Sequence, residues 1–278
     1  MKKETNIFPT LLRTLQRKTM AVNGKRPHRL VPGMTLYKHD ATKILKYTAI
    51  LIFLFSTHAE AKECVILLHG LARTKRSLSE LQAALTDAGY HTVNNGYPST
   101  KHKIEKLAKD AIPGALALCP SGTKIHFVTH SMGGILVRRY LSTKKIANLG
   151  RVVMLAPPNK GSQVVDNLKD FPGFSLMNGP AGRQLGTEKR SVPNSLGPAE
   201  FELGIIAGTR SINLILSMML PNPDDGKVSV ENTKLEGMSD HITLPVTHPF
   251  MMKNKDVIKQ VIHFLKNGVF EHKGSKNP

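Results

Sequence analysis

Residues 129–134 read Thr129-His130-Ser131-Met132-Gly133-Gly134. The apolar run that ends at Thr129 predicts a buried strand, and the pattern from Met132 to Leu141 predicts a helix. A serine at a sharp turn between a strand and a helix is typical of a nucleophile elbow, which projects the hydroxyl above the end of the sheet. Such a turn needs small neighbours, and Gly133 meets this need, although Thr129 replaces the usual first glycine. Ser131 is therefore the predicted nucleophile, the alternative being an ordinary N-cap serine.

On both sides of this turn, short apolar runs alternate with helical patterns. Strands are predicted at 64–68, 91–97, 124–129, 151–156, 203–208 and 241–247, and helices at 79–89, 104–118, 132–141 and 256–265. We expect Pro113 to kink or divide the second helix. The alternation is typical of a doubly wound, mostly parallel sheet flanked by helices.

One long segment, residues 157–202, interrupts the alternation. It is rich in Gly, Pro, Asn and Ser and shows neither a strand nor a helix period. A connection of that length in a compact domain is usually functional. The sequence therefore predicts a small lid or cap insertion here.

A second motif, Leu67-Leu68-His69-Gly70-Leu71, ends the first predicted strand. In combination with an elbow about 60 residues later, it predicts an oxyanion hole formed by the backbone N–H groups of Leu71 and Met132. The Met132 N–H lies at the positive end of the following helix. We expect His69 to support its turn by hydrogen bonding, and His130 to point away from the nucleophile.

The expected base is His248, which follows the last predicted strand and precedes the closing helix. Its place in the chain matches the order serine, acid, histidine. A carboxylate must orient such a base. Asp224 and Asp225 lie in the turn before the last strand, where an Asp-Gly pair could also serve only to form the turn. Asp225 is preferred as the acid, with Asp224 and Asp240 as alternatives.

Together the motifs resemble the lipase and esterase branch of the α/β-hydrolases, which includes bacterial triacylglycerol lipases and GPI inositol-deacylase-like proteins. The resemblance spans residues 63–268 and rests on 65–71, 129–134, 156–162, 224–228 and 247–249. In these lipases an Asp-Gly-x-Val turn supplies the acid, and a histidine about twenty residues later supplies the base. Asp225 and His248 are 23 positions apart.

The resemblance implies the α/β-hydrolase fold with a lid, over residues 62–278, and a serine hydrolase that cleaves carboxylic esters without a cofactor or metal. Ser131, Asp225 and His248 are its implied catalytic residues. An apolar stretch at 171–177 could bias the lid toward acyl lipids or shape a pocket for a small ester. The alternatives are an acyltransferase or thioesterase with the same triad, and a non-catalytic binding protein on this scaffold.

The two cysteines, Cys64 and Cys119, precede strands that are neighbours in the α/β-hydrolase sheet. Both cysteines should therefore lie at the same edge. An even number of cysteines in an exported chain favours a disulfide between them.

The N-terminal region predicts export. The apolar stretch 48–57 follows Lys43 and Lys46, and a small-x-small pair at 59–61 predicts cleavage after Ala61. The stretch is shorter than the roughly 20 residues that cross a bilayer. We therefore expect a periplasmic or secreted protein, with an uncleaved membrane anchor as the alternative, and a translation start at Met34.

The formal net charge is +19. Residues 1–61 carry 11 Lys and Arg against 3 Asp and Glu, and the remainder carries 28 against 17. The basic residues are scattered, and no nucleic-acid-binding motif accompanies them. We therefore expect no nucleic-acid partner and a mainly solvated basic surface, with peripheral attraction to membrane lipid as the alternative.

Overall fold

The computed structural model describes residues 63–272, and the predicted extension and signal peptide, residues 1–61, lie outside this range. Its centre is a six-stranded sheet in the order β2-β1-β3-β4-β5-β6. All five strand pairs are parallel, which confirms the doubly wound sheet. The strands are β1 (Cys64–Leu68), β2 (His91–Asn94), β3 (Ile125–His130), β4 (Leu149–Leu155), β5 (Leu203–Gly208) and β6 (Asp240–Leu244).

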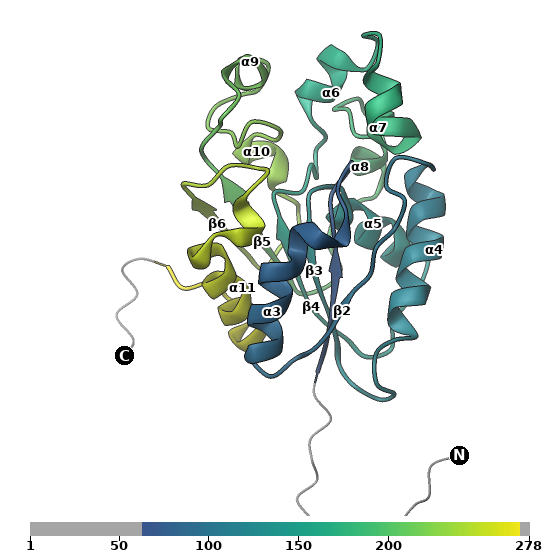
Figure 1. Ribbon diagram of the computed structural model, residues 1–278, viewed down its shortest axis with the longest axis vertical. Coiled ribbons are helices and arrows are strands. Elements are labelled where there is room, and N and C mark those ends of the chain that lie inside the picture. The colour runs from purple at the N-terminus through teal and green to yellow at the C-terminus, as the bar shows by residue number, and fades with distance from the viewer. Residues whose placement is uncertain (1–62, 273–278) are drawn as a thin grey trace, which may run out of the picture. The chain divides into compact units, whose positions relative to one another are not determined.

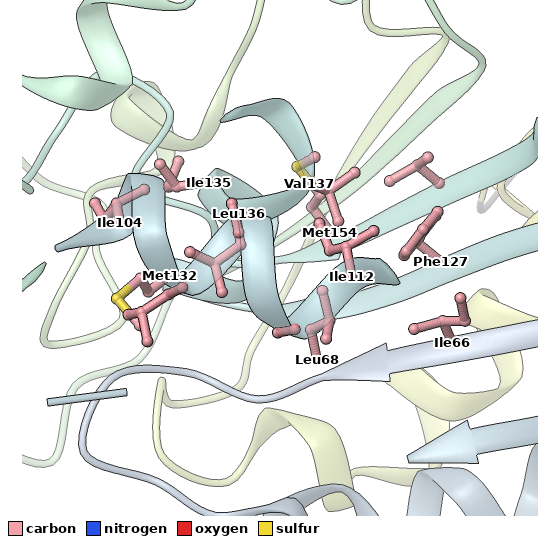
Figure 2. Close-up of a cluster of buried hydrophobic side chains, with 14 of the residues drawn as sticks. Ile66, Leu68, Ile104, Ile112, Phe127, Met132, Ile135, Leu136, Val137 and Met154 are labelled. Carbon is pink, nitrogen blue, oxygen red and sulfur yellow. The ribbon is translucent and has the colours of Figure 1, made fainter. Parts of the chain in front are cut away.

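Helices cover both faces of the sheet (Figure 1). On one face lie α4 (Ile104–Leu116) and α5 (Met132–Leu141), and on the other lie α3 (Ser79–Asp87) and α11 (Lys255–Asn267). The 3-10 helices η1 (Lys75–Leu78) and η2 (Met251–Lys253) lie beside α3 and α11. Successive residues of a strand point to opposite faces, so a strand covered on both sides is apolar throughout. In β1, Ile66 and Leu68 accordingly join the core shown in Figure 2, whereas Val65 and Leu67 join the other.

The sequence predicts that Pro113 kinks or divides α4, and the division does not occur, since the helix continues past Pro113 to Leu116. It lies near the C-terminal end of the helix, so only three helical residues follow it. The missing N–H deprives only the carbonyl of Lys109, an exposed residue, of its partner within the helix. Water can therefore satisfy that carbonyl.

The lid segment, residues 157–202, contains three helices that its sequence did not predict: α6 (Gln163–Leu168), α7 (Phe174–Arg183) and α8 (Val192–Ser195). The helical period is lost because α7 bends at Gly179, whose φ is +62°. A side chain is excluded there, since a Cβ would lie 1.8 Å from the Thr100 carbonyl oxygen. Because α7 contains Gly179 at the bend and Pro180 beside it, its sequence does not show the pattern of a regular helix.

The buried guanidinium of Arg138, on α5, anchors the base of this segment. It donates hydrogen bonds to the carbonyl oxygens of Asn159, Pro193 and Gly197 at 2.9–3.0 Å. Burial lowers the Arg138 pKa to about 10. Since α5 begins directly after Ser131, one helix carries the elbow and also ties down both ends of the lid segment.

Between β5 and β6 the chain forms α9 (Leu214–Ser217) and α10 (Val230–Thr233). The helices α6 and α7 on one side and α9 on the other stand at the carboxyl end of the sheet, at the top of Figure 1. Ligand sites of open parallel sheets lie at this end. Within residues 63–272, no helix is long and apolar enough to cross a membrane.

Candidate active site

Ser131 occupies a strained turn between β3 and α5. Its φ is +53°, a left-handed value that residues with side chains rarely adopt. The turn is held by hydrogen bonds from Ser131 N–H to Leu155 O (2.8 Å) and from Gly134 N–H to Ser131 O (3.0 Å). A Cβ on Gly133 would lie 2.4 Å from the Leu68 carbonyl oxygen, so α5 can approach β1 only with glycine here. Thr129, in place of the usual glycine, is fully buried.

His248 and Asp225 form a buried hydrogen-bonded pair. The Nδ1–H of His248 donates to Asp225 Oδ2 at 2.7 Å. The other carboxylate oxygen, Oδ1, accepts from the backbone N–H groups of Lys227 (3.0 Å) and Val228 (2.9 Å). A carboxylate bound in this way fixes the proton on Nδ1 and leaves Nε2 as the free basic nitrogen.

The alternative acids lie elsewhere. Asp224 is also buried, but its oxygens accept from the Ser217 hydroxyl (2.5 Å) and from the Gly226 N–H (2.7 Å). Asp240 begins β6, at the end of the strand remote from Ser131, and accepts from the N–H of Phe270. The structure thus brings only Asp225 of the three candidates to His248.

Ser131, His248 and Asp225 line one cavity of about 680 Å³, together with Leu71. The Ser131 hydroxyl makes no hydrogen bond among residues 63–272. Nucleophile and base often tighten their contact only when substrate is bound. The arrangement therefore holds a serine, a base and an acid at one cavity with the serine free to react.

Two backbone N–H groups beside Ser131 are without acceptors in the described chain, those of Leu71 and Met132. The next N–H of the loop, that of Ala72, donates to Ser99 Oγ at 3.1 Å. Leu71 lines the cavity, and Met132 is the first residue of α5. These are the two groups expected from sequence to stabilise an oxyanion.

His69 supports the turn that carries Leu71. Its Nδ1–H donates to Gly70 O at 2.9 Å, and its Nε2 accepts from the Tyr97 N–H at 3.4 Å. The ring stacks on Tyr97 with the centroids 4.1 Å apart, and the Tyr97 hydroxyl donates to His69 O. Burial lowers the pKa of His69 and so favours its neutral form.

His130 lies against His248 and lines the same cavity as Ser131, so the expectation that His130 points away from the predicted nucleophile was wrong. Its ring centroid is 4.7 Å from that of His248, and its Nε2–H donates to the His248 carbonyl at 3.0 Å. Burial holds the pKa of His130 well below its usual value, and His248 adds to the effect. A Cβ on Gly70 would lie 2.9 Å from His130 Nδ1, so the oxyanion loop and this ring are closely fitted.

Apolar side chains form the walls and rim of the cavity. One side comes from the lid segment and includes Phe171 and Met177, and the other comes from residues around α9 and includes Ile212 and Leu216. The α9 side was not identified from sequence, although 212–219 is an apolar run that the periodicity left unassigned. The exposed apolar residues on the two sides are Phe171, Leu176, Met177, Ile212, Leu214, Ile215 and Met218.

Two cations also line the cavity, Arg73 and Lys227. The sequence analysis did not identify them, because each is a single basic residue in a loop and the chain contains many other basic residues.

Away from the cavity, Cys64 at the start of β1 and Cys119 after α4 are joined by a disulfide. No three His, Cys, Asp or Glu side chains between residues 63 and 272 are grouped to hold a metal ion.

No protein-family model and no curated protein sequence matches the chain. Solved structures do match. The mature lipase BlEst2 of Bacillus licheniformis superposes with a TM-score of 0.53 at 17% identity, over 74% of this chain and 92% of that one. The chain has the α/β-hydrolase fold.

Two further structures support this assignment of the fold. The phospholipase PlaB of Legionella pneumophila matches with a TM-score of 0.61 at 17% identity, over 75% of this chain and 60% of PlaB. The metagenomic carboxyl esterase MGS0156 matches with a TM-score of 0.51 at 20% identity, over 68% of this chain and 65% of the esterase. The fold expected from the motifs is confirmed, and the three solved structures compared above are a lipase, a phospholipase and a carboxyl esterase.

Proposed function

We propose that the protein is a serine hydrolase of carboxylic esters. The observation that carries this proposal is the 2.7 Å bond between Asp225 and His248 at a cavity that also contains Ser131 on its strained turn. A strained backbone at Ser131 lowers the stability of the fold, and such strain is typical of functional sites. A serine beside a histidine that is oriented by a carboxylate is the arrangement that acyl transfer uses. Metal or cofactor chemistry is not required for it.

The reaction has two steps. His248 Nε2 takes the Ser131 proton as the hydroxyl oxygen attacks the ester carbonyl, and the N–H groups of Leu71 and Met132 stabilise the oxyanion. The carbonyl re-forms, the alcohol leaves with the proton from His248, and an acyl-enzyme remains. Water then attacks this acyl group, His248 again transfers the proton, and the acid is released. Asp225 stabilises the imidazolium in both steps.

The test is labelling with a fluorophosphonate probe and turnover of short-chain and long-chain p-nitrophenyl esters. We expect the wild-type protein to be labelled and active, and Ser131→Ala to lose both. Ser142→Ala removes an exposed hydroxyl at the other end of α5 and should retain both. A folded wild-type protein that is not labelled would favour the non-catalytic binding protein instead.

We also propose an acyl lipid as the substrate class, with peripheral association with a lipid surface. The apolar residues that flank the cavity on α7 and around α9 support this choice, because exposed apolar groups around a site mark an apolar contact. A small ester remains the alternative, and the chain-length profile decides between them. An acyltransferase or thioesterase would be recognised by faster transfer to an added alcohol, or by faster turnover of thioesters.

Export with cleavage after Ala61 is proposed as well. The disulfide between Cys64 and Cys119 supports it, since such bonds persist in oxidising compartments. N-terminal sequencing of the protein from producing cells should begin at Lys62. A mature chain that retains residues 48–57 would instead support the uncleaved anchor.

A further inference from the structure

Two cationic side chains at the cavity have no partner. Arg73 follows the loop that carries Leu71, and Lys227 lies in the turn that carries Asp225. In the part of the chain that the structure describes, neither side chain makes a hydrogen bond or an ion pair. By contrast, other basic residues with an acid nearby do pair, as Lys160 does with Glu231 at 2.7 Å.

The lining of the cavity offers no free carboxylate that could pair with Arg73 or Lys227. Among residues 63–272, the only carboxylate that lines the cavity is Asp225, which is already bound by His248 and two backbone N–H groups. The remaining lining is largely apolar. Both side chains are exposed, so water reaches them, and a negatively charged ligand in the cavity would supply the partner that the lining does not.

The cations are also close enough to affect each other and the site. Loss of hydration lowers the pKa of Lys227, Asp225 opposes this change, and the charge of Arg73 lowers the pKa further. The Arg73 charge also contributes to the low pKa of His130, next to the nucleophile. Arg73 and Lys227 therefore act on the same space as Ser131.

We infer that Arg73 and Lys227 form a subsite for a negatively charged group of the substrate, a carboxylate or a phosphate, whose ester carbonyl lies at Ser131. This inference rests on the proposed function and narrows its substrate class. Arginine suits the planar, two-oxygen face of such a group, and lysine adds a mobile point charge. The apolar walls would take the hydrocarbon part of the same molecule.

The first experiment compares two soluble esters of equal length, mono-p-nitrophenyl glutarate and p-nitrophenyl pentanoate, of which only the glutarate carries a negative charge. The measured quantity is the ratio of kcat/KM for the glutarate to that for the pentanoate. We expect Arg73→Gln and Lys227→Gln each to lower this ratio about tenfold, since each removes a charged hydrogen-bond donor. The matched control Arg76→Gln removes an exposed cation of η1, three residues after Arg73 and outside the cavity lining, and should leave the ratio unchanged.

A binding measurement separates this inference from the proposed function. Calorimetry on the Ser131→Ala protein should show octyl phosphate binding at least tenfold more weakly when both cations are replaced by glutamine. Binding of the uncharged octyl glucoside should not change. If the wild-type protein hydrolyses no ester but this difference is found, the subsite stands and the proposed function fails. If esters are hydrolysed but octyl phosphate binds equally with and without the cations, the subsite is overturned.

The source of the charge is identified with vesicles. Faster release of fatty acid from phosphatidylglycerol than from phosphatidylcholine, lost in the double variant, would assign the charge to a lipid headgroup. A preference found only for the glutarate ester would assign it to a soluble substrate. Absence of any charge preference in all these assays would overturn the inference.

Discussion

Asp225 and His248 are joined twice, by the side-chain bond of 2.7 Å and by a 3.0 Å bond from the His248 backbone N–H to the Asp225 carbonyl. The second bond fixes the position of the His248 backbone, and the first then fixes its ring. The neighbouring Asp224 has a different role, because its oxygens accept from Ser217, at the end of α9, and from Gly226, within the turn. Two adjacent carboxylates therefore separate into an orienting acid and a turn-forming acid.

Asp225→Asn should lower kcat/KM for esters by roughly 10,000-fold, because the amide cannot hold the proton on Nδ1 of a catalytic histidine. Asp224→Asn is the matched control. It retains an acceptor for the turn and should keep most activity per folded molecule while lowering the midpoint of thermal unfolding. The measurements are steady-state kinetics and thermal denaturation of both variants. Equal activity losses in the two variants would assign both carboxylates to one structural role.

The sheet was predictable because β1, β3 and β5 are buried on both faces and read as continuous apolar runs. Their predicted bounds agree with the structure within one residue at each end, whereas β2 is three residues shorter than the predicted 91–97. The last part of that stretch belongs instead to the loop in which Tyr97 stacks on His69. This contact joins residues 28 positions apart, and such contacts are not visible in the periodicity of a sequence.

Site residues were predictable where the backbone conformation restricts the residue type, as at the sharp turn of Ser131 and Gly133. The orientation of the His130 side chain was not predictable, because it depends on a contact with His248, 118 positions later. The α9 side of the cavity was missed for a similar reason. Its apolar residues face outward and so lack the period of a core-facing helix. Arg73 and Lys227 could be identified only from the folded chain, in which both line the cavity and neither side chain forms an ion pair.

Gly133→Ala should prevent the turn at Ser131, between β3 and α5, from adopting its present conformation. The new methyl group would meet the Leu68 carbonyl oxygen, and relieving the clash requires α5 to move away from β1. We expect the free energy of unfolding to fall by about 1–3 kcal/mol or more, as for other overpacked cores. Urea denaturation measures this change, and probe labelling of Ser131 should fall with it.

The control for this variant is Gly114→Ala, in α4. The added methyl group there has its nearest neighbour 4.0 Å away, at the Asn95 side chain. Replacing glycine with alanine inside a helix stabilises it by roughly 0.5–1 kcal/mol. If Gly133→Ala were as stable as Gly114→Ala, the close approach of α5 to β1 would not be a requirement of this fold.

Three buried histidines should make the protein less stable as the pH falls below about 6.5. Burial lowers the pKa values of His69, His126 and His130 from 6.5, so the unfolded chain takes up protons in a range where the folded chain does not. The free energy of unfolding then decreases with falling pH, by up to about 1.4 kcal/mol per pH unit for each histidine. Urea denaturation between pH 5 and 7.5 measures the slope, and His130→Gln should reduce it. A stability that rises toward pH 5 would contradict this account.

The rim of the cavity should determine binding to lipid surfaces. Leu176 and Met218, on its two sides, are 88% and 79% exposed and add little to the core. Burying each in a lipid interface would contribute about 1.5 kcal/mol, so the double variant Leu176→Ser and Met218→Ser should bind vesicles roughly a hundredfold more weakly. Leu118→Ser is the control, because Leu118 is 60% exposed and lies next to Cys119, which is bonded to Cys64 at the start of β1, at the opposite end of the sheet from α7 and α9. Vesicle co-sedimentation gives the affinities, and turnover of a water-soluble ester shows whether the site is intact. Since both replaced side chains are exposed, a loss of soluble-ester turnover equal to the loss of vesicle binding would mean that α7 and the α9 region shape the cavity and do not contact lipid.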